Sequence, residues 1–247
     1  MISLSEIKRC ESDHNFRNVI SLGYFCAPAM QLEKHGFRNA SYPFDWLIIT
    51  DFKLVLQLLA NGFENSDFLN ITYFAQAKLK KNYYQNTKTG VRFLHEFNEF
   101  NSLNSQFDSF SAKYQRRMNR FQEDIKKSTL FIRYISGATE LEYIEANLES
   151  IDAIIKHKCF ENEILYVCDN KLNPKIDIFT TIVESGLVNY KFMEDSEYSL
   201  IEWLKKNYSR PLVFRKKKKN ILKKINKHVE GAFRKKYTHH LVYDDLD

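Results

Sequence analysis

The sequence predicts an α/β fold, a three-layer sandwich with a mostly parallel sheet, an inserted β-hairpin and a basic C-terminal helical tail. Apolar runs that suit buried strands alternate with helical patterns, and this alternation favours parallel pairing with helices on both faces. A chain of 247 residues, 44% of them hydrophobic, can bury the core that such a fold needs. Lysine and arginine are concentrated near the C-terminus. We therefore divide the chain into an α/β domain of catalytic type, residues 1–208, and a basic amphipathic extension, residues 209–247.

The first strand and helix place a cysteine between them. Residues 19–22 are apolar and partly β-branched, and they run into Gly23, as expected for a buried strand that turns at once. The helix expected at 27–35 carries Pro28 in its first turn, where a missing N–H costs nothing. Cys26 should then lie at the helix N-terminus, where backbone N–H groups make a thiol more acidic and more nucleophilic. A cysteine that only fills space is the competing interpretation.

The middle of the chain predicts a hairpin flanked by helices. Residues 41–50 suit a loop with an aromatic plug, and a helix follows at 52–60. Two runs joined around residues 86–90 predict the hairpin. Residues 103–126 carry aromatic side chains every three or four positions, which predicts a long helix with these rings in the core.

The second half predicts the regular part of the sheet. Strands are expected at 129–135, 163–169 and 189–193, and helices at 139–157, 176–184 and 200–207, with Thr139 and Glu142 as a capping box. The three strands should be parallel neighbours with helices crossing between them. Ligands in open α/β sheets bind outside the carboxyl ends of the strands, where Cys26, Arg133, Asp169 and Glu194 or Asp195 are expected.

Arg133 falls inside an apolar run, so it must point out of the strand face or meet an anion. A carboxylate of the same chain is one interpretation, and a phosphate or substrate carboxylate is the other.

Composition excludes several classes of protein. The N-terminal segment is polar after four residues and no apolar run reaches the length of a membrane span, so we expect a cytoplasmic protein. Cys10, Cys26, Cys159 and Cys168 form no C-x-x-C pair and have no metal-ligand spacing, which predicts reduced thiols, no metal and no cofactor. The P-loop, G-x-G-x-x-G, H-E-x-x-H and G-x-S-x-G motifs are absent.

The net charge of +6 conceals an asymmetry. Residues 210–236 hold 12 basic residues and one acidic residue, whereas the rest of the chain has a net charge of −5. Apolar residues at near-helical spacing, with lysines opposite, predict a basic amphipathic helix; they are Ile221, Leu222, Ile225, Val229 and Phe233. This helix either docks on the domain or binds an anionic membrane surface, which would place the protein at the inner face of the membrane. No nucleic-acid motif accompanies the charge, so nucleic acid is not an expected partner.

Residues 21–46, SLGYFCAPAMQLEKHGFRNASYPFDW, resemble the opening of a bacterial family of unknown function described as papain-like cysteine peptidases. The resemblance continues through FLHEF, RRMNRF and LFIRY, and covers most of residues 19–170. It implies Cys26 as nucleophile, His95 as its base and Asp45 as a possible orienting carboxylate. Glu96 follows the histidine where the family usually has aspartate. A half-buried structural histidine and a turn-capping aspartate are the alternatives for His95 and Asp45.

Three functional hypotheses follow. The first is a thiol hydrolase that cleaves amide or ester bonds by a Cys-His mechanism. The second is an SGNH-like acyl- or glycan-modifying transferase or esterase in surface polysaccharide biosynthesis, an architecture that α/β alternation favours over the helical lobe and β-barrel lobe of papain. The third is a non-enzymatic binding module. For an enzyme, the substrate is a small molecule, peptide or glycan, contacted by Gly23, Tyr24, Trp46, Arg133 and Asp169.

Overall fold

The computed structural model of the protein describes residues 1–2, 5, 7, 14–77, 82–135, 137–176, 179–181, 193 and 200–214. Its strands are β1 (Asn18–Ser21), β2 (Leu47–Ile48), β3 (Phe74–Gln76), β4 (Tyr84–Asn86), β5 (Arg92–Phe93), β6 (Thr129–Ile135), β7 (Glu163–Asp169) and β8 (Phe179–Thr181). Its α-helices are α2 (Ala27–Lys34), α3 (Phe52–Asn61), α4 (Leu103–Asp124), α5 (Ala138–Ala146), α6 (Leu148–Lys156) and α7 (Leu200–Lys206), and short 3₁₀ helices lie at Asp67–Leu69, Ile71–Tyr73 and Asn170–Leu172.

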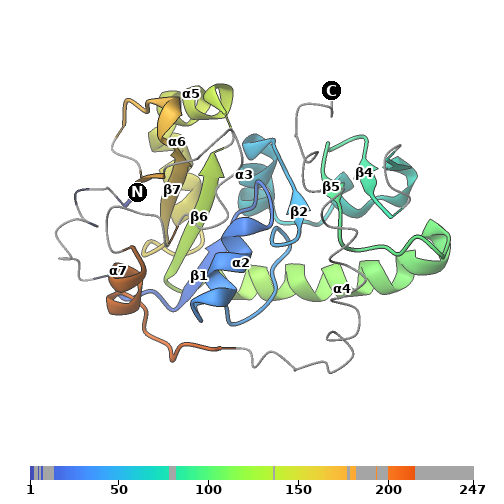
Figure 1. The fold of residues 1–247 in the computed structure, drawn as a ribbon, viewed down its shortest axis with the longest axis horizontal. Coiled ribbons are helices and arrows are strands. Elements are labelled where there is room, and N and C mark those ends of the chain that lie inside the picture. The colour runs from blue at the N-terminus through green and yellow to red at the C-terminus, as the bar shows by residue number, and fades with distance from the viewer. Residues whose placement is uncertain are drawn as a thin grey trace, which may run out of the picture.

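A parallel sheet with the strand order β1-β6-β7-β8 forms the centre of the molecule (Figure 1). All seven residues of β6 are buried, as expected for a strand with neighbours on both sides and helices on both faces. The predicted strands 129–135 and 163–169 are confirmed with these bounds and are parallel neighbours. In Figure 1 the strands begin at the lower edge of the sheet and end at the upper edge, near α5.

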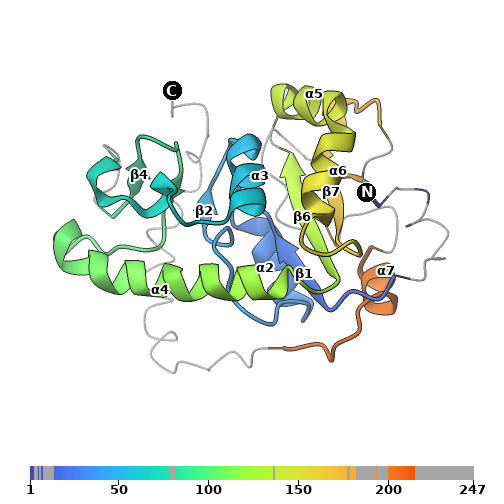
Figure 2. The ribbon, with the colours of Figure 1, turned by 180° about the vertical axis from the view of Figure 1, so that it is seen from behind.

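Helices cover both faces of the sheet, which confirms the three-layer class. Because side chains alternate across a strand, Leu130 and Ile132 pack on one face of β6 and Phe131 and Ile135 on the other. Residues of α2 and α7 belong to the first core, and residues of α3, α4, α5 and α6 belong to the second. Figures 1 and 2 show these two layers from opposite sides.

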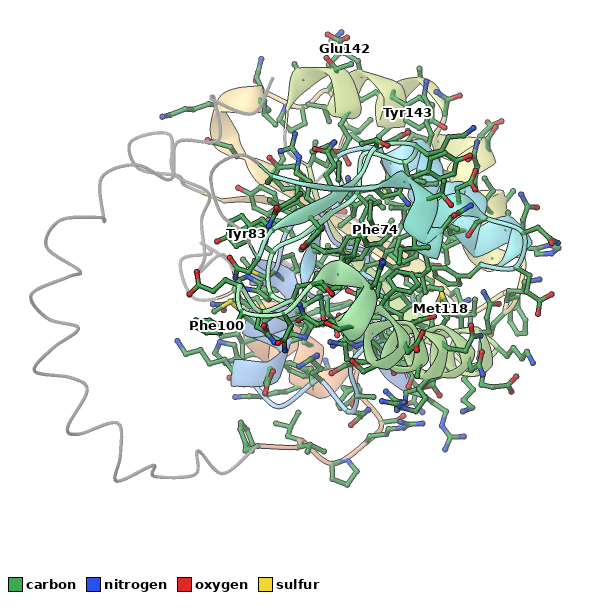
Figure 3. The ribbon with its side chains drawn as sticks, turned by 90° about the vertical axis from the view of Figure 1, so that its right-hand side faces the viewer. Phe74, Tyr83, Phe100, Met118, Glu142 and Tyr143 are labelled. Atoms are coloured by element: carbon green, nitrogen blue, oxygen red, sulfur yellow. The ribbon has the colours of Figure 1, made fainter. Side chains whose placement is uncertain are left out.

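A second, antiparallel sheet has the order β2-β5-β4-β3 and contains the predicted hairpin, β4 with β5. Aromatic rings join this sheet to α4. The ring centroid of Phe93 lies 5.1 Å from that of Phe74 and 5.2 Å from that of Phe110 on α4. Phe74 lies among these rings beside α4 (Figure 3). The aromatic residues of α4 are therefore core residues, as expected.

Two predicted helices differ in the structure. The helix expected at 139–157 is two helices, α5 and α6, because Asn147 leaves the helical region at φ −130° and its side-chain amide donates to the Tyr143 carbonyl. The N-cap of α5 is Gly137, so the predicted capping box of Thr139 and Glu142 is wrong. The segment 41–50, expected as a loop, contains the short strand β2.

The helix expected at 176–184 is wrong at residues 179–181, which form strand β8 beside β7. Aromatic and β-branched residues favour a strand there, and they satisfy the hydrogen-bonding edge of β7. The third parallel strand was expected at 189–193, of which 189–192 lie outside the described residues and Met193 lies in a turn.

The described part of the C-terminal extension packs on the domain. The Ser209 amide donates to the Phe16 carbonyl over 2.9 Å, and the Val213 amide donates to the Gly36 carbonyl over 2.8 Å. The predicted amphipathic helix and its apolar stripe lie outside the described residues. Within the part of the chain that the structure describes, no helix combines the length and apolar character that a bilayer crossing requires.

Candidate active site

A constrained turn joins β1 to α2. Gly23 has φ +80° and Tyr24 has φ +68°, both in the left-handed region. A Cβ at position 23 would lie 2.8 Å from Cγ2 of Ile49 and 3.3 Å from the Phe44 carbonyl oxygen, so only glycine fits this close approach. The Ile49 amide donates to the Tyr24 carbonyl over 2.9 Å and holds the turn against the segment that follows β2. Strained backbone of this kind persists only where the surroundings hold it, and it is common at functional sites.

Arg133 holds the same turn from the neighbouring strand. Its guanidinium is fully buried and donates through Nε to Glu140 at 2.6 Å, through Nη1 to the Leu22 carbonyl at 3.0 Å and through Nη2 to the Ile49 carbonyl at 3.1 Å. Its Cζ also lies 4.9 Å from the ring centroid of Phe52. Of the two interpretations for Arg133, the structure confirms that its partner is a carboxylate of the same chain, Glu140. The arginine positions the turn, because both carbonyls flank it.

Cys26 is the N-cap residue of α2 and is partly buried. Its carbonyl accepts the first helical hydrogen bond, from the Met30 amide over 3.0 Å. Burial raises the pKa of the Cys26 thiol above its ordinary value, and a hydrogen bond from its own backbone amide opposes only part of this rise. The predicted acidic thiol is therefore wrong in direction, because desolvation of the thiolate outweighs the stabilisation expected at the helix N-terminus.

His95 lies in the loop after β5 with its side chain exposed. The preceding residue, Leu94, is partly buried and packs against the same hydrophobic core as Tyr24, a core that also contains Phe25 and Ala27. The histidine loop and the cysteine turn therefore contact one shared core. Among the described residues, neither Cys26 nor any carboxylate forms a hydrogen bond with the His95 imidazole. The described residues therefore show no preformed hydrogen bond between the Cys26 and His95 side chains.

Glu96 anchors the histidine loop to α4. Its carboxylate accepts hydrogen bonds from Lys113, from Tyr114 Oη at 3.2 Å and from Arg117 Nη1 at 2.9 Å, and only 3% of its side chain is exposed. Burial alone would raise the pKa of Glu96, but the bonds from Lys113 and Arg117 lower it below its ordinary value. Glu96 therefore belongs to an ion-pair network that fixes the loop beside His95.

Asp45 is 1% exposed and binds Arg38. Its Oδ2 accepts from Arg38 Nε at 3.0 Å, from Arg38 Nη2 at 2.8 Å and from the Tyr42 amide at 2.7 Å. Its complete burial raises the pKa of this carboxyl, and the Arg38 guanidinium opposes the rise. Trp46 packs under the same guanidinium, with 5.0 Å from Arg38 Cζ to the indole ring. The structure thus gives Asp45 a partner other than His95, and it places Trp46 in packing contact.

Asp169 ends β7 at the expected carboxyl edge of the sheet, where its side chain accepts from the Lys171 amide at 3.0 Å. Strand β6 separates β7 from β1, so two strand spacings, roughly 10 Å, lie between Asp169 and the cysteine turn. Glu194 and Asp195 lie outside the described residues. No group of acidic, histidine and cysteine side chains that could hold a metal ion is found among the described residues.

Four supporting residues were not identified from the sequence: Arg38, Glu96, Arg117 and Glu140. Each is one half of a buried or partly buried ion pair around the site. In the sequence, a charged residue surrounded by aromatic or apolar residues indicates a buried ion pair, because a charge needs a partner when it is buried. Its partner could not be read from the sequence, because the paired residues lie up to 21 positions apart.

The Cys26 thiol lies at a helix N-terminus and follows a strained turn at the carboxyl edge of a parallel sheet. Nucleophiles of α/β hydrolytic enzymes occupy the same place in their folds. This class agrees with the comparisons to known proteins. Residues 17–185 match the model of the family described as "Putative papain-like cysteine peptidase (DUF1796)", and the chain belongs to this family. The matched range contains Cys26, Asp45 and His95, and the family indicates a cysteine hydrolase in the general sense.

The chain is also similar to "Uncharacterized protein R408" of Acanthamoeba polyphaga mimivirus, with 28% identity over 174 residues, 60% of this chain and 76% of the viral protein. The family prediction is confirmed, but its description as bacterial is not shown, and this relative is viral. No solved structure matches the chain.

Proposed function

We propose that the protein is a cysteine-dependent hydrolase of amide or ester bonds in which Cys26 is the nucleophile. One observation carries the proposal: Cys26 is the N-cap of α2 and follows the Gly23-Tyr24 turn after one intervening residue, at the carboxyl edge of the parallel sheet. The turn is held by Arg133 and by the backbone of Ile49. This support fixes the position of the thiol more tightly than a space-filling role requires.

The proposed mechanism starts from a protonated thiol, because burial raises the pKa of Cys26. A protonated thiol is a weak nucleophile, so attack requires a base that removes the proton as the Sγ–acyl bond forms. His95 is the candidate base, because its loop and the cysteine turn contact the same core and its exposed side chain is free of hydrogen bonds within the described residues. The imidazolium then returns the proton to the leaving amine or alcohol, and water releases the acyl group from sulfur.

The first turn of α2 supports the oxyanion. The first N–H groups of a helix have no acceptor within the helix, and in α2 these include the amides of Ala27 and Ala29, while Pro28 has none. A negatively charged oxygen on the acyl carbon is stabilised where such donors converge. Loss of one donor of this kind lowers kcat by about 10²–10³ in hydrolytic enzymes.

Acyl transfer is the second candidate function, and the parallel three-layer architecture favours it. The sheet differs from the two lobes of papain, and an α/β scaffold with a nucleophile at its carboxyl edge suits esterases and acyltransferases. The two functions share the acyl-cysteine intermediate and differ in whether water or an alcohol accepts the acyl group.

Activity towards an activated ester and a fluorogenic peptide amide tests the proposal. We expect Cys26→Ala to abolish turnover and His95→Gln to reduce it by about 10²–10⁴-fold, the usual contribution of a general base. Cys159→Ala is the matched control, because it removes another partly buried thiol. Equal activity of the Cys26→Ala variant and the control would refute the nucleophile. Product analysis with added glycerol as acceptor distinguishes hydrolysis from transfer.

A further inference from the structure

A cavity of about 520 Å³ lies at the edge of the parallel sheet where the strands begin. Its walls come from the residue before β1, the turn before β6, the segment before β7 and the chain after α7. Charged side chains and one thiol line it: Arg17, Lys126, Lys127, Cys159, Glu161 and Arg210. Figures 1 and 2 show this edge, near the end of α4 and α7. The Cys26 turn follows the last residue of β1, at the opposite edge.

Four cations face a single lining carboxylate in this cavity. Lys126 forms an exposed ion pair with Glu123 at 2.7 Å, and such pairs are worth less than about 1 kcal/mol. Lys127 pairs at 2.9 Å with Asp124, whose side chain is largely buried. Arg17 and Arg210 have no carboxylate partner in the described part of the chain. Guanidinium groups bind phosphate oxygens in a two-pronged geometry, so these two arginines are the natural ligands for an anion.

The backbone that carries the two arginines is fixed. The Arg17 amide donates to the Ser128 carbonyl over 2.8 Å, and Phe16 pairs with Tyr208 in a parallel bridge. The Ser209 amide and hydroxyl both donate to the Phe16 carbonyl, at 2.9 and 3.1 Å. Arg17 and Arg210 therefore extend from paired segments of chain on the same wall. The cavity volume is that of a small-molecule site and exceeds what one phosphate group fills.

We propose that this cavity is a binding site for a phosphate ester, with Arg17 and Arg210 contacting the phosphate oxygens. The charge of the lining residues favours an anion, and an open cavity of this volume admits a phosphate that is attached to a larger group. The sequence beyond the cavity, residues 215–236, is also strongly basic and would raise the local concentration of phosphate-bearing ligands. The site is independent of Cys26 and of the proposed hydrolase activity.

Cys159 reports directly on the cavity, because its thiol is one of the lining groups. Full-length protein is alkylated with iodoacetamide in the presence and absence of inorganic pyrophosphate, and each cysteine is quantified by peptide mass spectrometry. We expect pyrophosphate to slow alkylation of Cys159 and to leave Cys26 unchanged. In an Arg17→Gln/Arg210→Gln variant, the pyrophosphate concentration for half protection should rise at least about a hundredfold, the loss expected for two charge-assisted hydrogen bonds.

Arg116→Gln is the control, since Arg116 is exposed on α4 and its side chain bonds only the Ala112 carbonyl. It should behave as wild type. A second arm uses vesicles with and without a phosphatidylinositol phosphate, and protection by these vesicles alone assigns the phosphate to a lipid headgroup. Failure of both probes to protect Cys159 overturns the site. So does unchanged protection in the double variant, which would assign the phosphate to other basic residues. Neither result depends on whether Cys26 is catalytic.

Discussion

Removal of the Arg133 guanidinium tests the central structural feature of the site. In the Arg133→Met variant, a side chain of similar length fills the space, but the Glu140 carboxylate and the Leu22 and Ile49 carbonyls lose the hydrogen bonds that Arg133 donates. Arg133 is fully buried and the Glu140 side chain is only 7% exposed. Truncation of one partner of a buried ion pair costs about 3–5 kcal/mol, because the other charge stays buried and uncompensated.

Equilibrium unfolding in urea measures this cost, with tryptophan fluorescence as the signal. The buried Trp203 and the half-buried Trp46 report on the two sides of the fold. With an m-value of about 2–3 kcal/mol/M, the predicted loss moves the unfolding midpoint down by about 1–2 M. Glu140→Gln should cost less, because the amide oxygen still accepts from Arg133 Nε.

Arg116→Met is the matched control for Arg133→Met. Both variants replace arginine with methionine, but Arg116 is exposed and bonds only a carbonyl of its own helix. The control should change the free energy of unfolding by no more than about 0.5 kcal/mol. Equal midpoints for the two variants would refute the argument that Arg133 holds the turn.

Three further predictions concern the turn, the histidine loop and the thiol. Gly23→Ala should lower the free energy of unfolding by about 2 kcal/mol or more, because the added Cβ would clash with Ile49. The control Gly90→Ala, where φ is +71° and no atom lies within 4 Å of the added Cβ, should cost only about 1 kcal/mol. Equal losses of the two variants in urea unfolding would contradict the close approach at Gly23. Because the pKa of Glu96 is lowered, its contribution to stability is present above pH 4.5 and is lost as the pH falls through the folded pKa. The stability advantage of wild type over Glu96→Gln should therefore shrink in acid, and an advantage that grows on acidification would be inconsistent with the ion pairs. The rate of Cys26 alkylation in free protein should rise with pH, with a midpoint above the ordinary pKa of a cysteine thiol, because burial raises the pKa of Cys26. A flat profile down to pH 6 would instead indicate a preformed thiolate.

The features predicted correctly from sequence are those set by local pattern. The strands 129–135 and 163–169 are confirmed to the residue, because an apolar run bounded by polar residues defines a buried strand. The start of α2 at Ala27 follows from Pro28 in the first turn. The Asn147 break and strand β8 were missed, because one depends on a side-chain cap and the other on an unpaired edge of β7.

The candidate site was predicted in part. The Cys26 turn follows from chemistry that is visible in the sequence, and so does the need of a buried Arg133 for an anion, but the sequence does not show that Glu140 is that anion. The raised pKa of Cys26 could not be predicted, because burial of the thiol is set by packing between distant segments. Asp45 and Arg38 are seven positions apart, yet only the folded loop shows that they bind each other.

Trapping of the acyl-enzyme tests directly whether Cys26 is the nucleophile. Full-length protein is mixed rapidly with p-nitrophenyl acetate, quenched in acid and digested, and the acetylated residue is located by mass spectrometry. We expect one acetyl group on Cys26, which forms faster as the pH rises and much more slowly in the His95→Gln variant. An acetyl group spread over Cys159 and Cys168 as readily as Cys26, or an equal rate of acetylation in Cys26→Ala, would contradict it.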